Sequence, residues 1–281
     1  MKNTPIIFHN NGPFTRGRLY SRLLEHKIFH DAAIQGRFRC PPELEIILSH
    51  NYRNKPILEK NLQYLGIEEY TVLGRDLDLW DHRQTVLMML EHLQQHSSKP
   101  YILYLDAADI LICDDPSKLL ERFKREFSCK VLFNAEKKSY PWIASVKTKQ
   151  SEEENRRIRM IEDFERGHYP APFVYLNSGA FIGERKFLIE VLKKCLECVP
   201  LFETKDCIYS NQILYREVHR LFYPKVMIDA ECRIFQTMVG IRFEEFKTKY
   251  PIKETEKFFC HLGYYLEYPW MALRGKVPKR K

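Results

Sequence analysis

The chain has 281 residues, of which 44% are hydrophobic, 29% charged and 13% aromatic. These proportions are ordinary for a soluble globular protein and argue against extended disorder. The formal net charge of +8 favours an anionic partner, such as a nucleotide, a nucleic acid or an acidic membrane surface.

Targeting and redox signals are weak. The first nine residues lack the long apolar core of a signal peptide. No apolar run approaches the ~20 residues needed to cross a bilayer. The eight cysteines show no zinc-type double pairing, and Cys195 and Cys198 are expected to pack inside a helix. We therefore expect a cytoplasmic protein with reduced thiols and no transmembrane segment.

Strand and helix patterns alternate through the first half of the chain. Short apolar runs predict strands, and 3.6-residue apolar spacing between them predicts helices. One helix should end at Gly66 and another should begin at Pro116. In chain order the expected elements are strand 43–49, helix 55–65, strand 70–74, helix 83–96, strand 101–105, helix 116–127 and strand 130–133. This alternation predicts an α/β fold with a largely parallel sheet.

The pattern changes beyond residue 140. Residues 151–166 predict a charged helix within a surface insertion at 145–170, and the apolar run 174–183 is interrupted by Asn177-Ser178-Gly179. That interruption indicates a bulge or a close backbone approach. Helices are expected at 184–199 and 208–217, and strands at 225–228 and 232–236. We expect one domain over residues 1–281, with 1–42 as a basic N-terminal extension.

The segment Asp106-Ala-Ala-Asp109 carries the main chemical signal. It places two carboxylates where a buried strand opens into a loop. Ligands of open α/β sheets sit outside the carboxyl ends of the strands. A divalent cation that bridges to a phosphate needs only one or two protein carboxylates. The pair therefore predicts a metal-held, phosphate-bearing substrate.

Further motifs follow in a fixed order. They are VLFNAE at 131–136, LNSGAFIG at 176–183, NQILY at 211–215, RIFQ at 233–236 and HLG at 261–263. Together with DAAD, this order resembles the glycosyltransferase domain of procollagen lysyl hydroxylases and its viral and bacterial relatives. The resemblance covers residues 43–265. It implies a GT-A type, Rossmann-like mixed sheet flanked by helices, with a UDP-sugar donor and Mn²⁺ or Mg²⁺.

The resemblance also implies roles for individual residues. Asp106, Asp109 and His261 would bind the metal. The donor nucleotide and its sugar would contact five positions, namely Arg83, Ala108, Tyr140, Asn177 and Gly179. Catalysis would involve Asn211, Gln212 and Asp229, with Asp229 or the departing phosphate accepting the proton of the acceptor hydroxyl.

Two positions depart from the family pattern. Relatives carry an aromatic residue that stacks on uracil where this chain has Ala108. They also carry acidic residues where this chain has Ser210 and Asn211. The nucleobase is therefore held differently or the donor is not a UDP-sugar. Likewise, either the acceptor and the catalytic groups differ or the activity is weak.

The sequence thus predicts a metal-dependent glycosyltransferase that uses a nucleotide-diphosphate sugar and a hydroxyl acceptor on a glycan or protein. Modified, hydroxymethylated DNA bases are an alternative acceptor, because basic residues gather at Arg16, Arg18, Arg22, Arg37 and Arg39. A non-catalytic nucleotide-sugar-binding module is a second alternative. A metal-dependent nuclease is a third, although it gives the LNSGAFIG segment no role.

Overall fold

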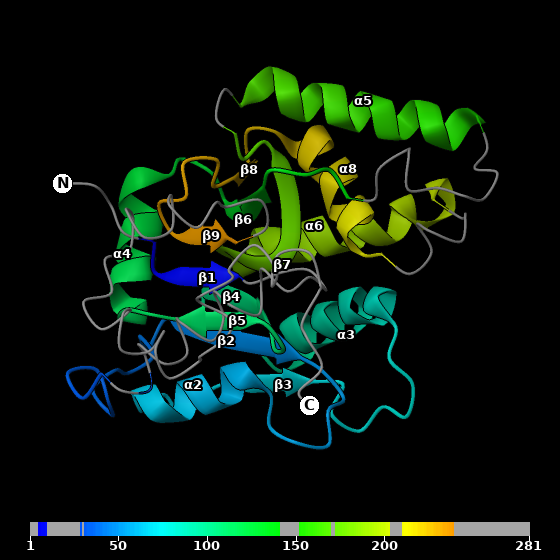
Figure 1. The fold of residues 1–281 in the computed structure, drawn as a ribbon. Coiled ribbons are helices and arrows are strands. Elements are labelled where there is room, and N and C mark those ends of the chain that lie inside the picture. Colours follow the sequence, from blue (N-terminus) through cyan, green and yellow to red (C-terminus); the bar gives the residue numbers. More distant parts are fainter. Residues whose placement is uncertain are drawn as a thin grey trace, which may run out of the picture.

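The computed structural model describes residues 5–9, 29, 31–140, 152–169, 172–202 and 210–238. Several predicted features lie outside these residues, among them His261, Arg16, Arg18 and Arg22. Within the described residues the protein is a mixed α/β fold, in which helices flank a central sheet (Figure 1).

The central sheet has six strands in the order β3-β2-β4-β7-β6-β8. Neighbouring strands are parallel except on both sides of β7, which runs antiparallel to β4 and β6. The sheet is therefore Rossmann-like and mixed, as the resemblance implied. The strands are β2 (Leu44–Ser49), β3 (Thr71–Leu73), β4 (Tyr101–Asp106), β6 (Val131–Glu136), β7 (Tyr175–Glu184) and β8 (Val226–Ile228).

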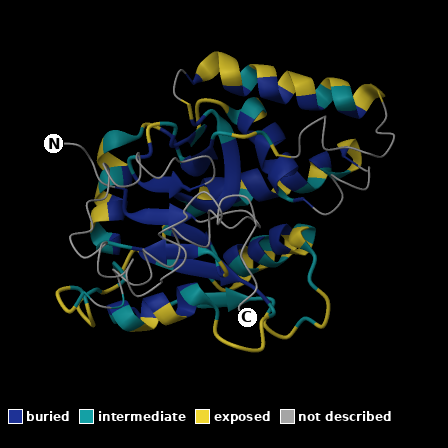
Figure 2. Ribbon diagram, in the orientation of Figure 1, coloured by how far each residue is buried: buried dark blue, intermediate teal, exposed yellow. Residues whose placement is uncertain are grey.

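Two hydrophobic cores lie on the two faces of this sheet. Alternate residues of β4 divide between them, since Ile102 and Tyr104 belong to one core and Leu103 and Leu105 to the other. Apart from the partly buried edge strand β3, the strands are accordingly buried on both faces (Figure 2). The first core includes α3 (His82–Gln95), α5 (Glu152–His168), α6 (Arg185–Cys198) and α8 (Gln212–Phe222), and the second includes α2 (Ile57–Leu65) and α4 (Pro116–Glu126).

Local sequence signals account for several helix ends. Gly66 ends α2 in the left-handed conformation with a φ of 84°, as predicted. Asp81 caps α3 by accepting from the backbone N–H of Arg83. Asp115 caps α4 in the same way, with Pro116 at the first position. The boundaries of these helices differ from the sequence-based ranges by no more than two residues.

A second, three-stranded sheet corrects the expectation for the N-terminus. Its order is β5-β1-β9, built from β1 (Ile7–His9), β5 (Ile110–Ile112) and β9 (Phe235–Thr237). Ile6, Ile7 and Phe8 are buried, so residues 5–9 are a structural part of the domain rather than an added extension. Strand β1 is distant in sequence from its partners β5 and β9, so local sequence patterns do not predict this pairing.

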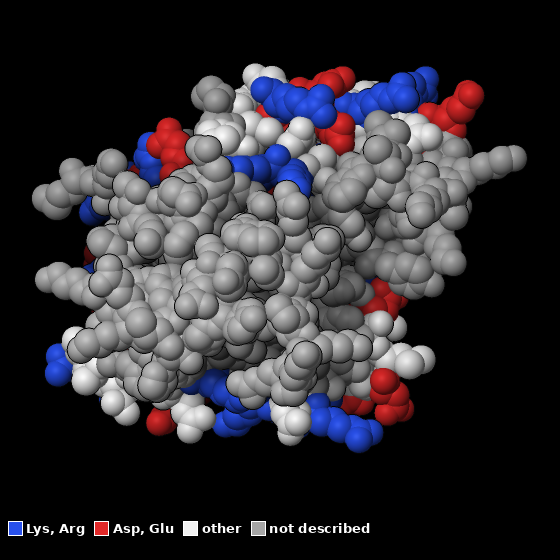
Figure 3. All heavy atoms as spheres, in the orientation of Figure 1, with Lys and Arg blue, Asp and Glu red and all other residues white. Residues whose placement is uncertain are grey.

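Helix α5 lies along one edge of the molecule, with its outer face exposed (Figures 1 and 2). Lys and Arg side chains lie along that face together with Asp and Glu (Figure 3). Its inner face is attached to α8 by a buried ion pair, in which Arg216 donates to Glu165 at 2.5 Å. Among the described residues, none of the helices is long and apolar enough to cross a bilayer.

Candidate metal centre

Asp106 directly precedes a tight turn, and Asp109 is the last residue of that turn. Asp106 ends β4, residues 107–109 form the turn, and β5 begins at Ile110. The orientation of Asp106 depends on Tyr104, whose hydroxyl donates to Asp106 Oδ1 at 3.2 Å. That hydroxyl is also 2.5 Å from Ser49 Oγ on the neighbouring strand. The first carboxylate is therefore held by a hydrogen bond from Tyr104, which Ser49 positions in turn.

His9 completes a cluster with these two carboxylates. Its Nε2 atom lies 3.3 Å from Asp109 Oδ1. One ligand atom from each of His9, Asp106 and Asp109 can be chosen so that all three lie within 4.8 Å of one another. Strand β1 brings His9 here because it pairs with β5, which follows directly after the turn. An imidazole nitrogen and two carboxylate oxygens are a donor set that could hold a divalent cation.

Gly179 makes room for this cluster. A Cβ atom at position 179 would lie 2.2 Å from His9 Cε1 and 2.8 Å from Asp106 Oδ2. Any side chain there would force His9 and Asp106 apart. The register of β6 against β7 also shifts between Phe133 and Asn134. The predicted close approach at Asn177-Ser178-Gly179 is thus confirmed, together with an irregularity on the partner strand.

Asn177 orients the imidazole of His9. Its Oδ1 atom lies 2.9 Å from His9 Nδ1, so Nδ1–H donates to Asn177 and Nε2 faces the carboxylates. The side-chain nitrogen of Asn134 lies farther from the same atom, at 3.3 Å. Metal-binding histidines are commonly oriented by an acceptor on the second ring nitrogen. The arrangement therefore suits a metal ligand at Nε2.

The ionisation of the cluster reflects burial and close charges. Burial favours neutral His9, but the attraction and hydrogen bond of Asp109, with the charges of Asp106 and Glu136, outweigh it and raise the pKa of His9 to about 9. Burial raises the pKa of Asp106 to about 7, against the opposing attraction of His9, and the charge of Asp109 adds to the increase. Two carboxylates held this close together are stabilised by a positive charge between them.

A second group of polar side chains lies beside the cluster on β6, β7 and α8. Gln212 donates to Glu136 Oε1 at 2.7 Å, and its oxygen accepts from the backbone N–H of Ser178 at 3.2 Å. Asn211 accepts from the Ser178 hydroxyl at 3.3 Å and donates to Thr85 at 2.9 Å. Burial raises the pKa of Glu136, and the Gln212 contact opposes that shift. The structure therefore places Asn211 and Gln212 next to the strand that carries Asn177 and Gly179.

The remaining predicted residues lie in different surroundings. Arg83 donates to the backbone carbonyl of Phe202 at 2.5 Å. The carbonyl of Tyr140 accepts from Gln212 at 3.1 Å, while its side chain is half exposed. Ala108 is exposed in the turn between the two aspartates. His261 lies outside the described residues, so its predicted place in the centre stays a prediction.

Asp229 has a structural environment. Its carboxylate accepts backbone N–H groups of Arg233, Ile234 and Phe235, at 2.9, 2.6 and 2.8 Å, and the residue is 1% exposed. These bonds stabilise the turn that leads into β9, which begins three residues later than the expected strand. This geometry favours a structural role for Asp229 over the predicted contact with an acceptor hydroxyl.

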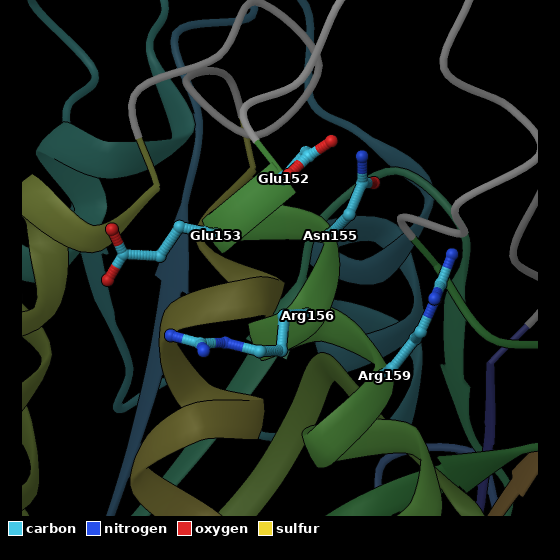
Figure 4. Close-up of a pocket in the computed structure, with 5 residues that line it drawn as sticks. All are labelled: Glu152, Glu153, Asn155, Arg156 and Arg159. Atoms are coloured by element: carbon cyan, nitrogen blue, oxygen red, sulfur yellow. The ribbon is translucent and has the colours of Figure 1, made fainter.

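A separate hollow of about 630 Å³ lies at the beginning of α5. It is lined by Glu152, Glu153, Asn155, Arg156 and Arg159, whose side chains spread from one end of the helix (Figure 4). None of these residues belongs to the His9 cluster. The hollow has charged groups of both signs, which gives it no clear preference for an anion or a cation.

Sequence reasoning had not singled out His9 and Glu136. The apolar residues before His9 resemble those before Asp106, and this could have indicated a strand ending in a ligand. Glu136 lies within the VLFNAE motif and likewise ends a buried strand. In both cases a polar residue at the end of a buried strand was the available signal.

The fold and the cluster define a Rossmann-like α/β protein with a candidate metal centre at the end of β4. No protein-family model matches the chain. A stretch of 194 residues, 67% of the chain, is 27% identical to procollagen-lysine,2-oxoglutarate 5-dioxygenase 1 of Gallus gallus, and it spans 23% of that protein.

One solved structure with some similarity is the 4-diphosphocytidyl-2C-methyl-D-erythritol synthase of Anaerococcus prevotii. The sequence identity is 13%, the TM-score is 0.34, and the similarity covers 70% of this chain and 88% of that one.

Proposed function

We propose that the protein is a metal-dependent glycosyltransferase of the GT-A type. It would move a sugar from a nucleotide-diphosphate sugar, such as a UDP-sugar, to a hydroxyl group of a glycan or protein. The observation that carries the proposal is the close approach of His9, Asp106 and Asp109 at the end of β4. The similarity to a procollagen-lysine dioxygenase supports it, because the motifs resemble the glycosyltransferase domain of such proteins.

In this proposal His9, Asp106 and Asp109 hold Mn²⁺ or Mg²⁺. When bound, the cation would supply Lewis-acid stabilisation to the diphosphate leaving group. Asn177 keeps His9 Nε2 directed at the site, and Tyr104 keeps Asp106 in place. Gly179 leaves the space that both ligands occupy. The resemblance implied His261 as the third metal ligand. In this proposal the third ligand is His9.

The sugar would lie over the polar group formed by Asn211, Gln212 and Glu136. Glu136 is a buried carboxylate next to an amide, and its raised pKa suits a group that exchanges a proton or hydrogen-bonds a hydroxyl. Asp229 is less suited to this task because three backbone N–H groups already occupy its oxygens. An acceptor hydroxyl would therefore approach from the side of α8.

A second candidate activity, suggested by the name of the chicken protein, is that of an iron- and 2-oxoglutarate-dependent dioxygenase. Such enzymes commonly bind iron through two histidines and one carboxylate. Among the described residues, the cluster has one histidine and two carboxylates. The donor set thus favours a cation that bridges to phosphate oxygens.

The proposal is tested by incubating the full chain with Mn²⁺ and a panel of nucleotide sugars, with release of the nucleoside diphosphate as the readout. We expect hydrolysis or transfer with at least one donor, and a loss of at least about 100-fold in the His9→Ala and Asp106→Asn variants. Asp114→Asn is the matched control, because Asp114 is an exposed carboxylate paired with Lys118. Unchanged turnover in Asp106→Asn would rule out the assigned centre.

Binding of Mn²⁺, followed by electron paramagnetic resonance, separates the two histidines without requiring turnover. His9→Ala should weaken binding, and His261→Ala should weaken it only if His261 is an additional ligand. If the wild-type chain binds nucleotide sugars with Mn²⁺ but turns over none of them with any acceptor, the protein is the non-catalytic binding module instead.

A further inference from the structure

The loop between β2 and α2 lies against the turn that carries the two aspartates. At its start, Ser49 is in register with Asp106 on the adjacent parallel strand. At its end, the backbone N–H of Leu58 donates to the carbonyl of Ala107 at 3.2 Å. The loop is therefore anchored on both sides next to the metal-centre turn.

Tyr52 is the large aromatic side chain of this loop. Its ring stacks on His50, with the centroids 5.4 Å apart and the planes at 19°. It remains 49% exposed, although tyrosine is an amphipathic residue that is usually more buried. Burial raises the pKa of Tyr52, and the charges of Asp109 and Asp106 raise it further, so the phenol lies within electrostatic reach of the metal centre.

The support beneath Tyr52 is rigid. His50 is 2% exposed, and its Nε2 atom lies 2.9 Å from Glu59 Oε1. Its Nδ1 atom accepts the backbone N–H of Tyr52 at 3.2 Å. Glu59 is held in turn by Arg75 at 3.0 Å. The aromatic ring is thus supported by a buried, hydrogen-bonded side chain. A ring held in this way loses little side-chain entropy when a ligand stacks on it.

We propose that Tyr52 provides the stacking surface for the nucleobase of a nucleoside diphosphate whose phosphates are held at the His9, Asp106 and Asp109 centre. The inference rests on the proposed function and adds to it a base-binding residue. Ala108, between the two aspartates, offers no ring for stacking, whereas Tyr52 in the neighbouring loop does. A half-exposed ring beside a metal-phosphate site suits a planar heterocycle better than a sugar alone.

Stacking on one aromatic ring has a defined energetic effect. It contributes about 1–3 kcal/mol for each base, and it depends little on which base is stacked. Removal of the ring should therefore weaken nucleotide binding about 5- to 150-fold. The phosphate contacts should be unaffected, because they belong to the metal centre.

The experiment compares a nucleotide with the same phosphates lacking a base. The full chain with Mn²⁺ is titrated calorimetrically with UDP, GDP, ADP, CDP and TDP, and with inorganic pyrophosphate. The tightest-binding nucleotide is then used with the Tyr52→Ala and Tyr52→Phe variants. We expect Tyr52→Ala to lose about 5- to 150-fold in nucleotide affinity and to bind pyrophosphate like the wild type. Tyr52→Phe should bind both ligands like the wild type.

Two results would overturn the assignment. One is unchanged nucleotide affinity in Tyr52→Ala, and the other is an equal loss for the nucleotide and pyrophosphate, which would mean that Tyr52 supports the metal centre itself. Failure of the proposed function looks different, because the wild-type chain would then bind neither any of the nucleotides nor pyrophosphate in the presence of Mn²⁺.

Discussion

The ring of His9 occupies the space that a side chain at position 179 would need. A Cβ atom on Gly179 would lie 2.2 Å from His9 Cε1, a distance that real Cβ atoms essentially never show. The glycine and the histidine come from strands of different sheets, β7 and β1. The small residue therefore determines whether a third ligand can reach the two aspartates.

We expect Gly179→Ala to disrupt the candidate metal centre. The added methyl group should displace His9 and Asp106, lower the free energy of unfolding by about 1–3 kcal/mol and weaken Mn²⁺ binding at least about tenfold. Unfolding in urea and Mn²⁺ titration followed by electron paramagnetic resonance measure the two effects.

Gly183→Ala is the matched control for this prediction. A Cβ atom there would lie 2.7 Å from Val131 Cγ2, in the same strand but away from the cluster. It should destabilise the fold to a similar extent and leave Mn²⁺ affinity unchanged. Equal losses of Mn²⁺ affinity in both variants would mean that the effect at Gly179 comes from the strand and not from His9.

Asn177→Ala should reduce metal affinity without removing any ligand. Asn177 accepts from His9 Nδ1 at 2.9 Å, and loss of such an orienting partner typically costs about 10- to 100-fold in metal affinity. Mn²⁺ titration of Asn177→Ala and Asn177→Asp measures the effect. Asp retains an acceptor oxygen, so it should recover much of the affinity, and equally weak binding in both variants would argue against the orienting role.

The central sheet and the aspartate pair could be predicted because their signals are local. Short apolar runs at 46–48, 101–105 and 131–133 mark β2, β4 and β6. Asp106 follows the second of these runs directly, and Asp109 lies three residues later. A short strand that ends at His9 has a similar local signal, but the place of His9 beside the two aspartates could not be predicted in this way. Its place depends on the pairing of β1 between β5 and β9, whose residues are distant in sequence.

Other differences have a similar origin. The antiparallel direction of β7 is set by its neighbours, since a buried apolar run does not encode strand direction. The sequence suggests Asp229 as an acid–base residue. In the structure its carboxylate accepts hydrogen bonds from three backbone N–H groups within a turn. The sequence predicts a close approach at Gly179 but does not identify His9 as the residue that lies against it.

The ion pair between Arg216 and Glu165 should be important for the attachment of α5. Both side chains are fully buried, and Arg216 also donates to the carbonyl of Tyr140 at 3.1 Å. Replacing only Arg216 with methionine leaves a buried, uncompensated carboxylate, which should lower the free energy of unfolding by about 3–5 kcal/mol. Urea denaturation measures this.

The double variant Arg216→Met/Glu165→Leu separates the charge effect from packing. Removing both charges should restore a large part of the stability lost in Arg216→Met. If the double variant is as unstable as the sum of the two single variants, the contacts of Arg216 and Glu165 with other groups matter more than their mutual attraction.

His219 should make the fold sensitive to mild acid. The residue is fully buried on α8, and its Nε2 atom lies 2.8 Å from the Tyr169 hydroxyl. Burial, followed by repulsion from Arg216 and His168, lowers the pKa of His219 from 6.5 to about 3. The folded state therefore resists a proton that the unfolded chain accepts below pH 6.5. Stability from this group is fully present above that pH and is lost as the pH falls.

At pH 5 the loss from His219 should be about 2 kcal/mol relative to pH 7.5. Urea midpoints at the two pH values measure it, and the His219→Gln variant should show a correspondingly smaller difference between them. Glutamine keeps an oxygen that can accept from Tyr169 but has no proton to gain in this range. An equal acid sensitivity in the variant and the wild type would mean that other groups cause the effect. Glu136 and Glu165 are not among these groups, because burial raises the pKa of each and acid therefore favours their folded state.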